Sequence, residues 1–254
     1  MACKNSKRCN CLRRDGGSSR LLFGVDSTTP ANTLLQNNLD MFEWVRRNKI
    51  YPAFWGRNIA GEDALTREEI VFLKEKVCKI APIYSPNGET GTYLQGKACS
   101  EETALRAKEL SIPMGRIIFL DLDKHQTITT EFLFGYAATL IAARYIPGFK
   151  ANTDAKYGFD REFSRGMQMY KEVFSQCFIW ATAPILPEYE RMTTTHLLHP
   201  DEWKPFAPSG VKRKDIAIWQ YGNECHPIYD DNDKHTMFNI DLVQNEEIII
   251  EHLY

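Results

Sequence analysis

From Leu21 onward, the chain alternates between short apolar runs and stretches with helical periodicity, and this alternation limits the possible folds more than any other feature. Eight runs have the length and composition of buried strands, at residues 21–27, 50–55, 80–85, 116–121, 148–152, 177–183, 216–221 and 238–243. Predicted helices separate most of them, at 33–48, 66–78, 100–110, 127–145 and 159–176. Apolar runs separated by helices are typical of a parallel sheet covered on both faces, and eight such units favour closure into a barrel.

The sequence therefore predicts one α/β domain at residues 21–254, a (β/α)8-type (TIM-like) barrel that follows a disordered leader at 1–20. The leader is polar and ends in a Gly-Gly-Ser-Ser run. Helical patterns fade after Ala183, and residues 184–215 are rich in Pro, Thr and His, so the last third of the barrel should be irregular. An open doubly wound sheet is the alternative, but no Gly-rich phosphate loop follows any predicted strand.

Composition narrows the range of partners. The formal net charge is −2, and the sequence has no basic stripe, which argues against nucleic acid as the main partner. No apolar run approaches the roughly 18 residues of a membrane span. The basic residues before Leu21 lack an apolar h-region, so we expect no conventional signal peptide and a protein that is cytoplasmic or released by lysis or a non-classical route.

The seven cysteines are too irregular for a disulfide scaffold and favour a reducing compartment. Cys3, Cys9 and Cys11 crowd the leader, where a flexible thiol-bearing tail is a better interpretation than a zinc site, because no second ligand pair stands at zinc spacing. The late loops hold further potential ligands, namely His196, His199, His226, His235, Asp230, Asp231 and Asp233. They form no ordered motif, so the sequence predicts a solvated loop, and it predicts no metal or cofactor.

Four aspartates stand at or near strand ends: Asp26, Asp121, Asp123 and Asp241. Catalytic groups of barrels lie at the C-terminal strand ends, and Asp121 and Asp123, two residues apart, should face the same side. Two neighbouring carboxyl groups tend to have separated pKa values, which suits general acid catalysis on a glycosidic bond. The alternative interpretation is that these aspartates cap helices and accept hydrogen bonds from loop amides.

Aromatic side chains accompany these acids. Rings lie on or near strand ends at Tyr51, Trp55, Tyr84, Trp180, Trp219 and Tyr221. Sugars stack on such rings, although packing inside the barrel is an equally good interpretation. The predicted substrate-binding residues are Tyr84, Asn152, Trp180, Trp219, Gln220 and Tyr221.

Several short motifs occur in an order that resembles a known family. They are Phe23-Gly24-Val25-Asp26-Ser27, Tyr51 to Arg57, Leu65-Thr66 with Glu69-Ile70, Ala81-Pro82-Ile83-Tyr84, Ile118 to Asp123 and Trp219-Gln220-Tyr221. In this order they resemble a bacterial glycoside-hydrolase-like domain of unknown function, which is similar to the family 25 lysozymes (muramidases). The resemblance spans about residues 21–241.

The resemblance implies a site position by position. Asp26 matches the first-strand aspartate, Asp121 and Asp123 the acidic pair of the fourth strand, and Asp241 the aspartate after the Trp-Gln motif. Lysozymes of that family carry Asp-x-Glu on the fourth strand with the Glu as proton donor, whereas Asp123 is one methylene shorter.

The leading hypothesis is a glycoside hydrolase that acts on a cell-wall polysaccharide such as peptidoglycan without a cofactor. Asp123 would be the general acid, Asp121 and Asp26 would orient the substrate and stabilise an oxocarbenium-like transition state, and Asp241 would assist. The alternatives are a non-catalytic carbohydrate-binding or interaction module and, less favoured, a metal-dependent hydrolase that uses the aspartates and the late-loop histidines. Barrel closure should make Asp26 and Asp241 neighbours, and we expect Tyr84, Trp180 and Trp219 to wall the cleft.

Overall fold

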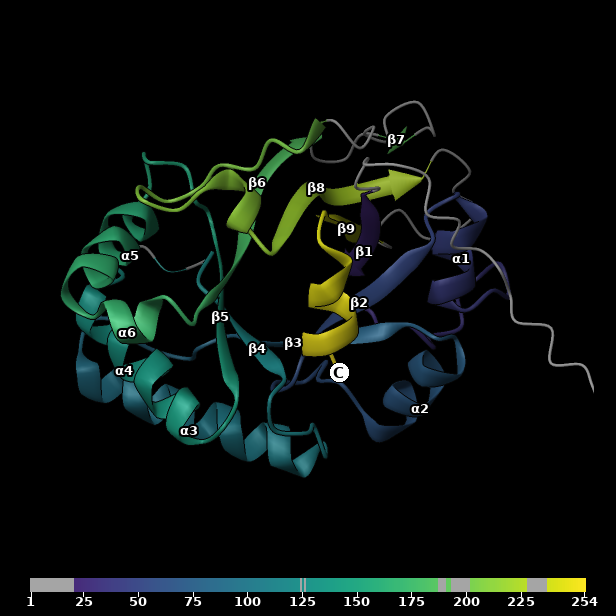
Figure 1. Cartoon of the computed structure of the whole chain (residues 1–254). Coiled ribbons are helices and arrows are strands. Elements are labelled where there is room, and N and C mark those ends of the chain that lie inside the picture. The colour runs from purple at the N-terminus through teal and green to yellow at the C-terminus, as the bar shows by residue number, and fades with distance from the viewer. Residues whose placement is uncertain (1–20, 124, 126, 187–190, 193–201, 228–236) are drawn as a thin grey trace, which may run out of the picture.

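Eight strands close into a barrel with helices around the outside, as the computed structural model shows for residues 21–123, 125, 127–186, 191–192, 202–227 and 237–254 (Figure 1). The barrel strands are β1 (Leu22–Asp26), β2 (Pro52–Asn58), β3 (Lys79–Tyr84), β4 (Ile117–Asp121), β5 (Ile146–Ala151), β6 (Phe178–Leu186), β8 (Ile218–Pro227) and β9 (Phe238–Val243). Neighbours pair in chain order from β1 to β6, and the β6–β8, β8–β9 and β9–β1 pairs complete the ring. The two-residue strand β7 (Arg191–Met192) adds to β8 outside the ring. The predicted α/β barrel and its eight strands are confirmed.

The direction of the last strand differs from the prediction. Strands β1 to β6 and β8 run parallel, whereas β9 is antiparallel to both β1 and β8. Parallel neighbours need a crossover of a dozen or more residues, and the interval between Pro227 and Phe238 is shorter than that. The short interval therefore requires an antiparallel return, which the pattern of apolar runs did not reveal.

The helices cover the first two thirds of the barrel. They are α1 (Met41–Arg47), α2 (Arg67–Glu75), α3 (Tyr93–Glu109), α4 (Thr130–Ala142), α5 (Gly158–Met169) and α6 (Lys171–Phe174). Beyond Phe174 the described residues contain only a 3-10 turn, η3 (Arg213–Asp215), and a π-helical turn, η4 (Ile248–His252). The last third of the barrel is irregular, as predicted.

Helix α1 is shorter than the predicted helix at 33–48. Leu35 donates its backbone N–H to the Leu39 carbonyl across a tight turn, and Asn38 has a φ of 62°. The Asp40 side chain then accepts the backbone N–H of Glu43 at 2.7 Å and caps the helix. Leucines at helical spacing therefore belong to a turn here, because Asn and Asp favour turns and caps over helix interiors.

Two apolar cores lie on either side of the sheet. One fills the space between the strands and the helices, and the other fills the barrel interior around Phe54, Phe119 and Trp180. The interior core continues into η4, whose Ile248 and Ile249 pack there with residues of the strands. Backbone hydrogen bonds of 2.8 and 2.9 Å between Ile80, near the start of β3, and Tyr254 hold this turn at the N-terminal end of the parallel strands. The opposite, C-terminal end is left for a site.

Helices α3 and α4 cross at two glycines. A Cβ atom on Gly96 would lie 2.1 Å from the Phe132 carbonyl oxygen, and one on Gly135 would lie 2.3 Å from the Tyr93 carbonyl oxygen. Both obstacles are backbone atoms, so an added methyl group would push the helices apart. We expect Gly96→Ala to lower the free energy of unfolding by about 1–3 kcal/mol in urea titrations. Gly158→Ala is the control, because nothing lies within 4 Å of its added Cβ; equal stability of the two variants would contradict this reading of the crossing.

Candidate active site

A cavity of about 660 Å³ opens at the C-terminal ends of the parallel strands. Its lining comes from the ends of most of these strands and from the adjoining parts of β8 and β9: Asp26, Ser27, Thr28, Thr29, Gly56, Asn58, Ile83, Ser85, Pro86, Asn87, Asp121, Asp123, His125, Lys150, Gln220, Asn223, Glu224, Met237, Phe238 and Asn239. The cavity lies at the end where barrels carry their catalytic groups.

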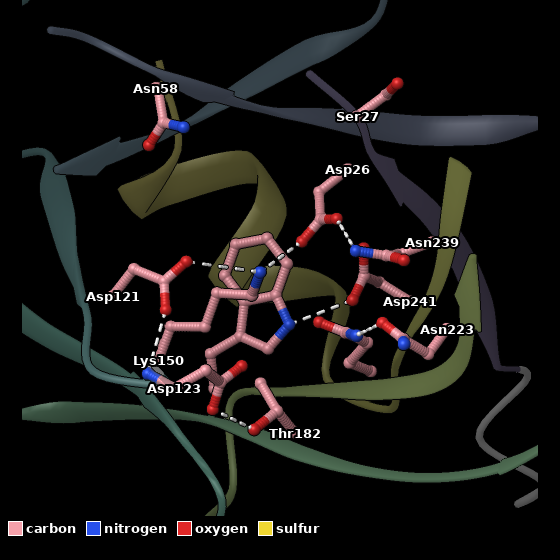
Figure 2. A network of polar contacts seen from close by, with 12 residues as sticks. Asp26, Ser27, Asn58, Asp121, Asp123, Lys150, Thr182, Asn223, Asn239 and Asp241 are labelled. Atoms are coloured by element: carbon pink, nitrogen blue, oxygen red, sulfur yellow. Dashed lines mark hydrogen bonds and ion pairs between the residues drawn. The ribbon is translucent and has the colours of Figure 1, made fainter. Parts of the chain in front are cut away.

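A lysine stands at the centre of the acidic residues (Figure 2). The Lys150 Nζ atom lies 2.7 Å from Asp26 Oδ2 and 3.7 Å from Asp121 Oδ2. These two carboxylate oxygens are therefore no farther apart than the sum of those distances, although Asp26 and Asp121 come from β1 and β4. The side-chain amide of Asn239 donates a hydrogen bond to the other oxygen of Asp26, so both oxygens of that carboxylate have partners.

Asp123 is the acid with the perturbed proton affinity at the open cavity. It follows β4 by two residues, where its backbone N–H donates to Asp121 Oδ1 at 3.1 Å, and its carboxylate accepts a hydrogen bond from the Thr182 hydroxyl. Desolvation by the surrounding protein raises the pKa of Asp123 to about 6. Lys150 opposes this rise, and the Asp121 carboxylate adds to it.

Asp241 lies beneath the cavity and is fully buried. It stands on β9 opposite Gly24 of β1, beside the Asp26–Asn239 pair, so the predicted proximity of Asp26 and Asp241 is confirmed. The Trp180 indole N–H donates to Asp241 Oδ1 at 2.9 Å. Burial and the nearby Asp26 carboxylate raise the pKa of Asp241 well above its ordinary value.

Barrel closure thus brings together all four predicted acids, but only Asp26, Asp121 and Asp123 reach the cavity. Asp241 is not among the residues that line it, so it cannot touch a ligand there. Any contribution of Asp241 passes through its neighbours Asp26 and Trp180.

The prediction that aromatic side chains wall the cavity is wrong. Trp180 is buried inside the barrel, edge-on to Phe54 and Phe119. Trp219 faces the outer core and donates its indole N–H to the Ala183 carbonyl at 3.0 Å. The same outer core holds Tyr84, Tyr221 and Trp55. Tyr51 is exposed but does not line the cavity. Large rings bury more apolar area in a core than at the edge of a cavity, and this burial stabilises the fold. The rings therefore lie in the cores and offer no stacking surface for a sugar.

The two predicted amide residues differ in their positions. Gln220 lines the cavity, where its Nε2 donates to Asn223 Oδ1 at 2.9 Å. Asn152 lies outside the lining and accepts the Asp154 backbone N–H at 3.0 Å, which makes it a turn residue.

Sequence reasoning missed a buried ion pair that supports the edge of the cavity. Arg57 at the end of β2 and Glu69 on α2 are fully buried, with Arg57 Nε 3.0 Å from Glu69 Oε1. The Arg57 guanidinium also donates to the carbonyls of Ser27 and Thr28, at 2.7 and 2.6 Å, in the loop that lines the cavity after β1. Thr66 caps α2 by accepting the Glu69 N–H, while the Glu69 carboxylate accepts the backbone N–H of Ala31 instead of closing a capping box.

Lys150 was also missed. Its signal was present, since a lysine inside a strand predicted to be buried on both faces needs a partner. One of its two partners follows from the strand register, because Asp121 of β4 lies opposite Lys150 of β5.

The late-loop histidines and aspartates, for which the sequence predicts a solvated loop, lie largely outside the described residues, at 193–201 and 228–236. The leader with Cys3, Cys9 and Cys11 does so too. In the described ranges, no three His, Cys, Asp or Glu side chains are arranged to hold a metal ion. None of the helices described has the length and apolar character required to span a bilayer.

No family model matches the chain, and no curated protein matches it. Solved structures do. An uncharacterized protein from B. stearothermophilus is 23% identical, with a TM-score of 0.73 over 92% of this chain and 100% of that one. A family GH25 lysozyme from Aspergillus fumigatus is 10% identical, with a TM-score of 0.50 over 91% and 97% of the two chains.

The modular autolysin LytC from Streptococcus pneumoniae, solved with a synthetic peptidoglycan ligand, is 12% identical, with a TM-score of 0.52 over 89% of this chain. This chain spans 47% of the autolysin. Identities this low show the fold alone, and that fold is similar to the folds of a family GH25 lysozyme and of part of a modular autolysin. The chain therefore has the barrel fold of the family 25 lysozymes.

Proposed function

We propose that this protein is a glycoside hydrolase that cleaves a cell-wall polysaccharide such as peptidoglycan. One observation carries the proposal: three carboxyl groups converge on one cavity at the C-terminal end of the barrel, and the pKa of one of them, Asp123, is raised. A glycosidase needs such a division between a protonated acid and ionised partners.

The proposal gives each of these groups a role. Asp123 protonates the glycosidic oxygen as the bond to the anomeric carbon breaks. The carboxylates of Asp26 and Asp121 stabilise the positive charge that develops on the sugar ring. Asp241 does not line the cavity and stays buried beneath it, next to Asp26.

The rest of the lining suits a polyhydroxylated ligand. It is rich in amides and hydroxyls, which both donate and accept hydrogen bonds: Ser27, Thr28, Thr29, Asn58, Ser85, Asn87, Gln220, Asn223 and Asn239. Phe238 is the one aromatic residue among the described lining residues, and it is buried. Sugar recognition here would rest on hydrogen bonds more than on stacking.

The non-catalytic carbohydrate-binding module is the second candidate. The observation that favours it is the ion pairing of Asp26 and Asp121 with Lys150, which occupies the carboxylates that a glycosidase directs at its substrate. Incubation with purified peptidoglycan separates the two, because a hydrolase releases new reducing ends and soluble fragments, whereas a binding module sediments with the polymer and releases neither. An added chelator tests for a metal-dependent hydrolase, which would lose its activity.

The pH dependence of hydrolysis provides a further prediction. A general acid must be protonated to act, and surrounding protein raises the pKa of Asp123 to about 6. We therefore expect kcat/KM to fall as the pH rises above about 6. Initial rates on soluble glycan fragments between pH 4 and 8 measure this, and a rate that keeps increasing up to pH 8 would contradict the assignment of Asp123.

A further inference from the structure

The search beyond the predicted residues leads to Lys150, a cation buried at the floor of the cavity. It stands on β5 between Asp121 of β4 and Trp180 of β6, both of which pair with it in register. Its side chain is only 7% exposed. A buried ammonium group is costly unless it is paired, so its position needs an explanation.

The contacts of Lys150 are specific. Its Nζ atom lies 2.7 Å from Asp26 Oδ2, 3.7 Å from Asp121 Oδ2 and 5.3 Å from the centre of the Trp180 ring. The distances rank the acids, since Asp26 and Asp121 have direct ion pairs with Lys150 while Asp123 bonds to Thr182. An ammonium group stabilises most the carboxylates that it touches.

The number of charged groups around Lys150 leads to the same distinction between the acids. Four aspartate carboxyl groups surround one ammonium here: Asp26 from β1, Asp121 from β4, Asp123 just after β4, and Asp241 from β9. Full ionisation would leave three negative charges uncompensated in a partly buried site, which close carboxyl groups avoid by holding protons. Glu224 and His125 also line the cavity, while Trp180 and Thr182 of β6 are neutral.

We propose that Lys150 is a positioning residue that holds Asp26 and Asp121 as an ionised, fixed pair and so leaves Asp123 as the acid that carries the transferable proton. The proposal rests on the glycoside hydrolase function and adds a residue to it. Lys150 acts through the carboxylates and does not touch the substrate. Its pKa is raised, because the attraction of Asp26, Asp121 and Asp123 outweighs the loss of hydration on burial.

The test is a carboxyl titration of the whole chain by carbon-13 NMR, with labelled aspartate and with resonances assigned from single Asp→Asn variants. In Lys150→Met we expect the titration that includes Asp123 to move to higher pH by at least about one unit, since Lys150 lowers the pKa of Asp123 in the native site. Lys150→Arg keeps the charge and should titrate close to the wild type. A folded Lys150→Met protein with an unchanged titration would overturn the proposal.

A second pair of variants covers the case in which Lys150→Met does not fold. Asp26→Asn alone is compared with Lys150→Met combined with Asp26→Asn, in which the carboxylate closest to the missing ammonium is also removed and only the more distant Asp121 loses an ion pair. The difference in the Asp123 titration between these two proteins isolates the effect of Lys150, and no difference would overturn the proposal.

Hydrolysis by the wild type separates this proposal from the broader one. If the wild type does not cleave peptidoglycan but the titration moves as expected, the proposed function fails and the charge arrangement stands. If the wild type cleaves and the titration does not move, the role of Lys150 fails alone. If both hold, the alkaline limb of the pH profile of Lys150→Met should move to higher pH with the titration.

Discussion

Asp123→Asn is expected to lower the rate of hydrolysis by a factor of about 10²–10⁴, the usual contribution of a general acid. Asparagine has nearly the same shape and can still accept the hydrogen bond of the Thr182 hydroxyl, but it has no proton to transfer. The free energy of unfolding should therefore stay within about 1 kcal/mol of the wild-type value. Release of reducing ends from purified peptidoglycan measures the rate, and urea titration measures the stability.

The control is Asp215→Asn, the same chemical change at an exposed residue of η3 away from the cavity, which should leave the rate unchanged. An aryl glycoside adds a sharper criterion. Its leaving group needs little protonation, so the loss in Asp123→Asn should be much smaller on that substrate than on the natural polymer. A variant that cleaves peptidoglycan at the wild-type rate would contradict the assignment of Asp123 as the acid.

Arg57→Met is expected to lower the free energy of unfolding by about 3–5 kcal/mol, the cost of leaving one partner of a buried ion pair unpaired. Glu69 would remain fully buried without its cation, and the carbonyls of Ser27, Thr28 and Asp63 would lose their donors. At about 2–4 °C per kcal/mol for a domain of this size, the loss should be evident in thermal unfolding.

Two further variants define the origin of that effect. Arg106→Met removes one partner of the exposed Arg106–Glu109 pair and should cost less than about 1 kcal/mol. The double variant Arg57→Met with Glu69→Leu removes both buried charges and should recover much of the lost stability. If the double variant is as unstable as the single one, the defect arises from the lost carbonyl contacts at the cavity edge, not from the unpaired carboxylate.

The strands were predictable because each is a short apolar run that is buried on both sides. Their number implied closure, and closure implied that Asp26 and Asp241 would meet. Direction was not predictable in the same way, since an apolar run has the same pattern in either orientation; only the short interval before Phe238 indicated that β9 returns antiparallel.

The site was predictable in its acids and not in its supporting residues. An aspartate that follows a buried strand stands out, as Asp26 and Asp121 did, whereas Lys150 and Arg57 are identified only once register and helix packing are known. The prediction for the aromatic residues failed because the orientation of their rings was unknown. Trp180 and Trp219 lie on strands as predicted, but one-dimensional spacing could not say whether a ring points into a cavity or into a core.

The pairing of β1 with β9 has a consequence for biosynthesis. The contact between Asp26 and Asn239 joins residues 213 positions apart. During synthesis, the second edge of β1 is therefore covered only after the residues of β9 have been added. Contacts of such long range form slowly, and an uncovered strand edge invites pairing with other chains. Ribosome-bound chains that stop before Phe238 therefore carry an open sheet edge along β1 until the residues of β9 emerge.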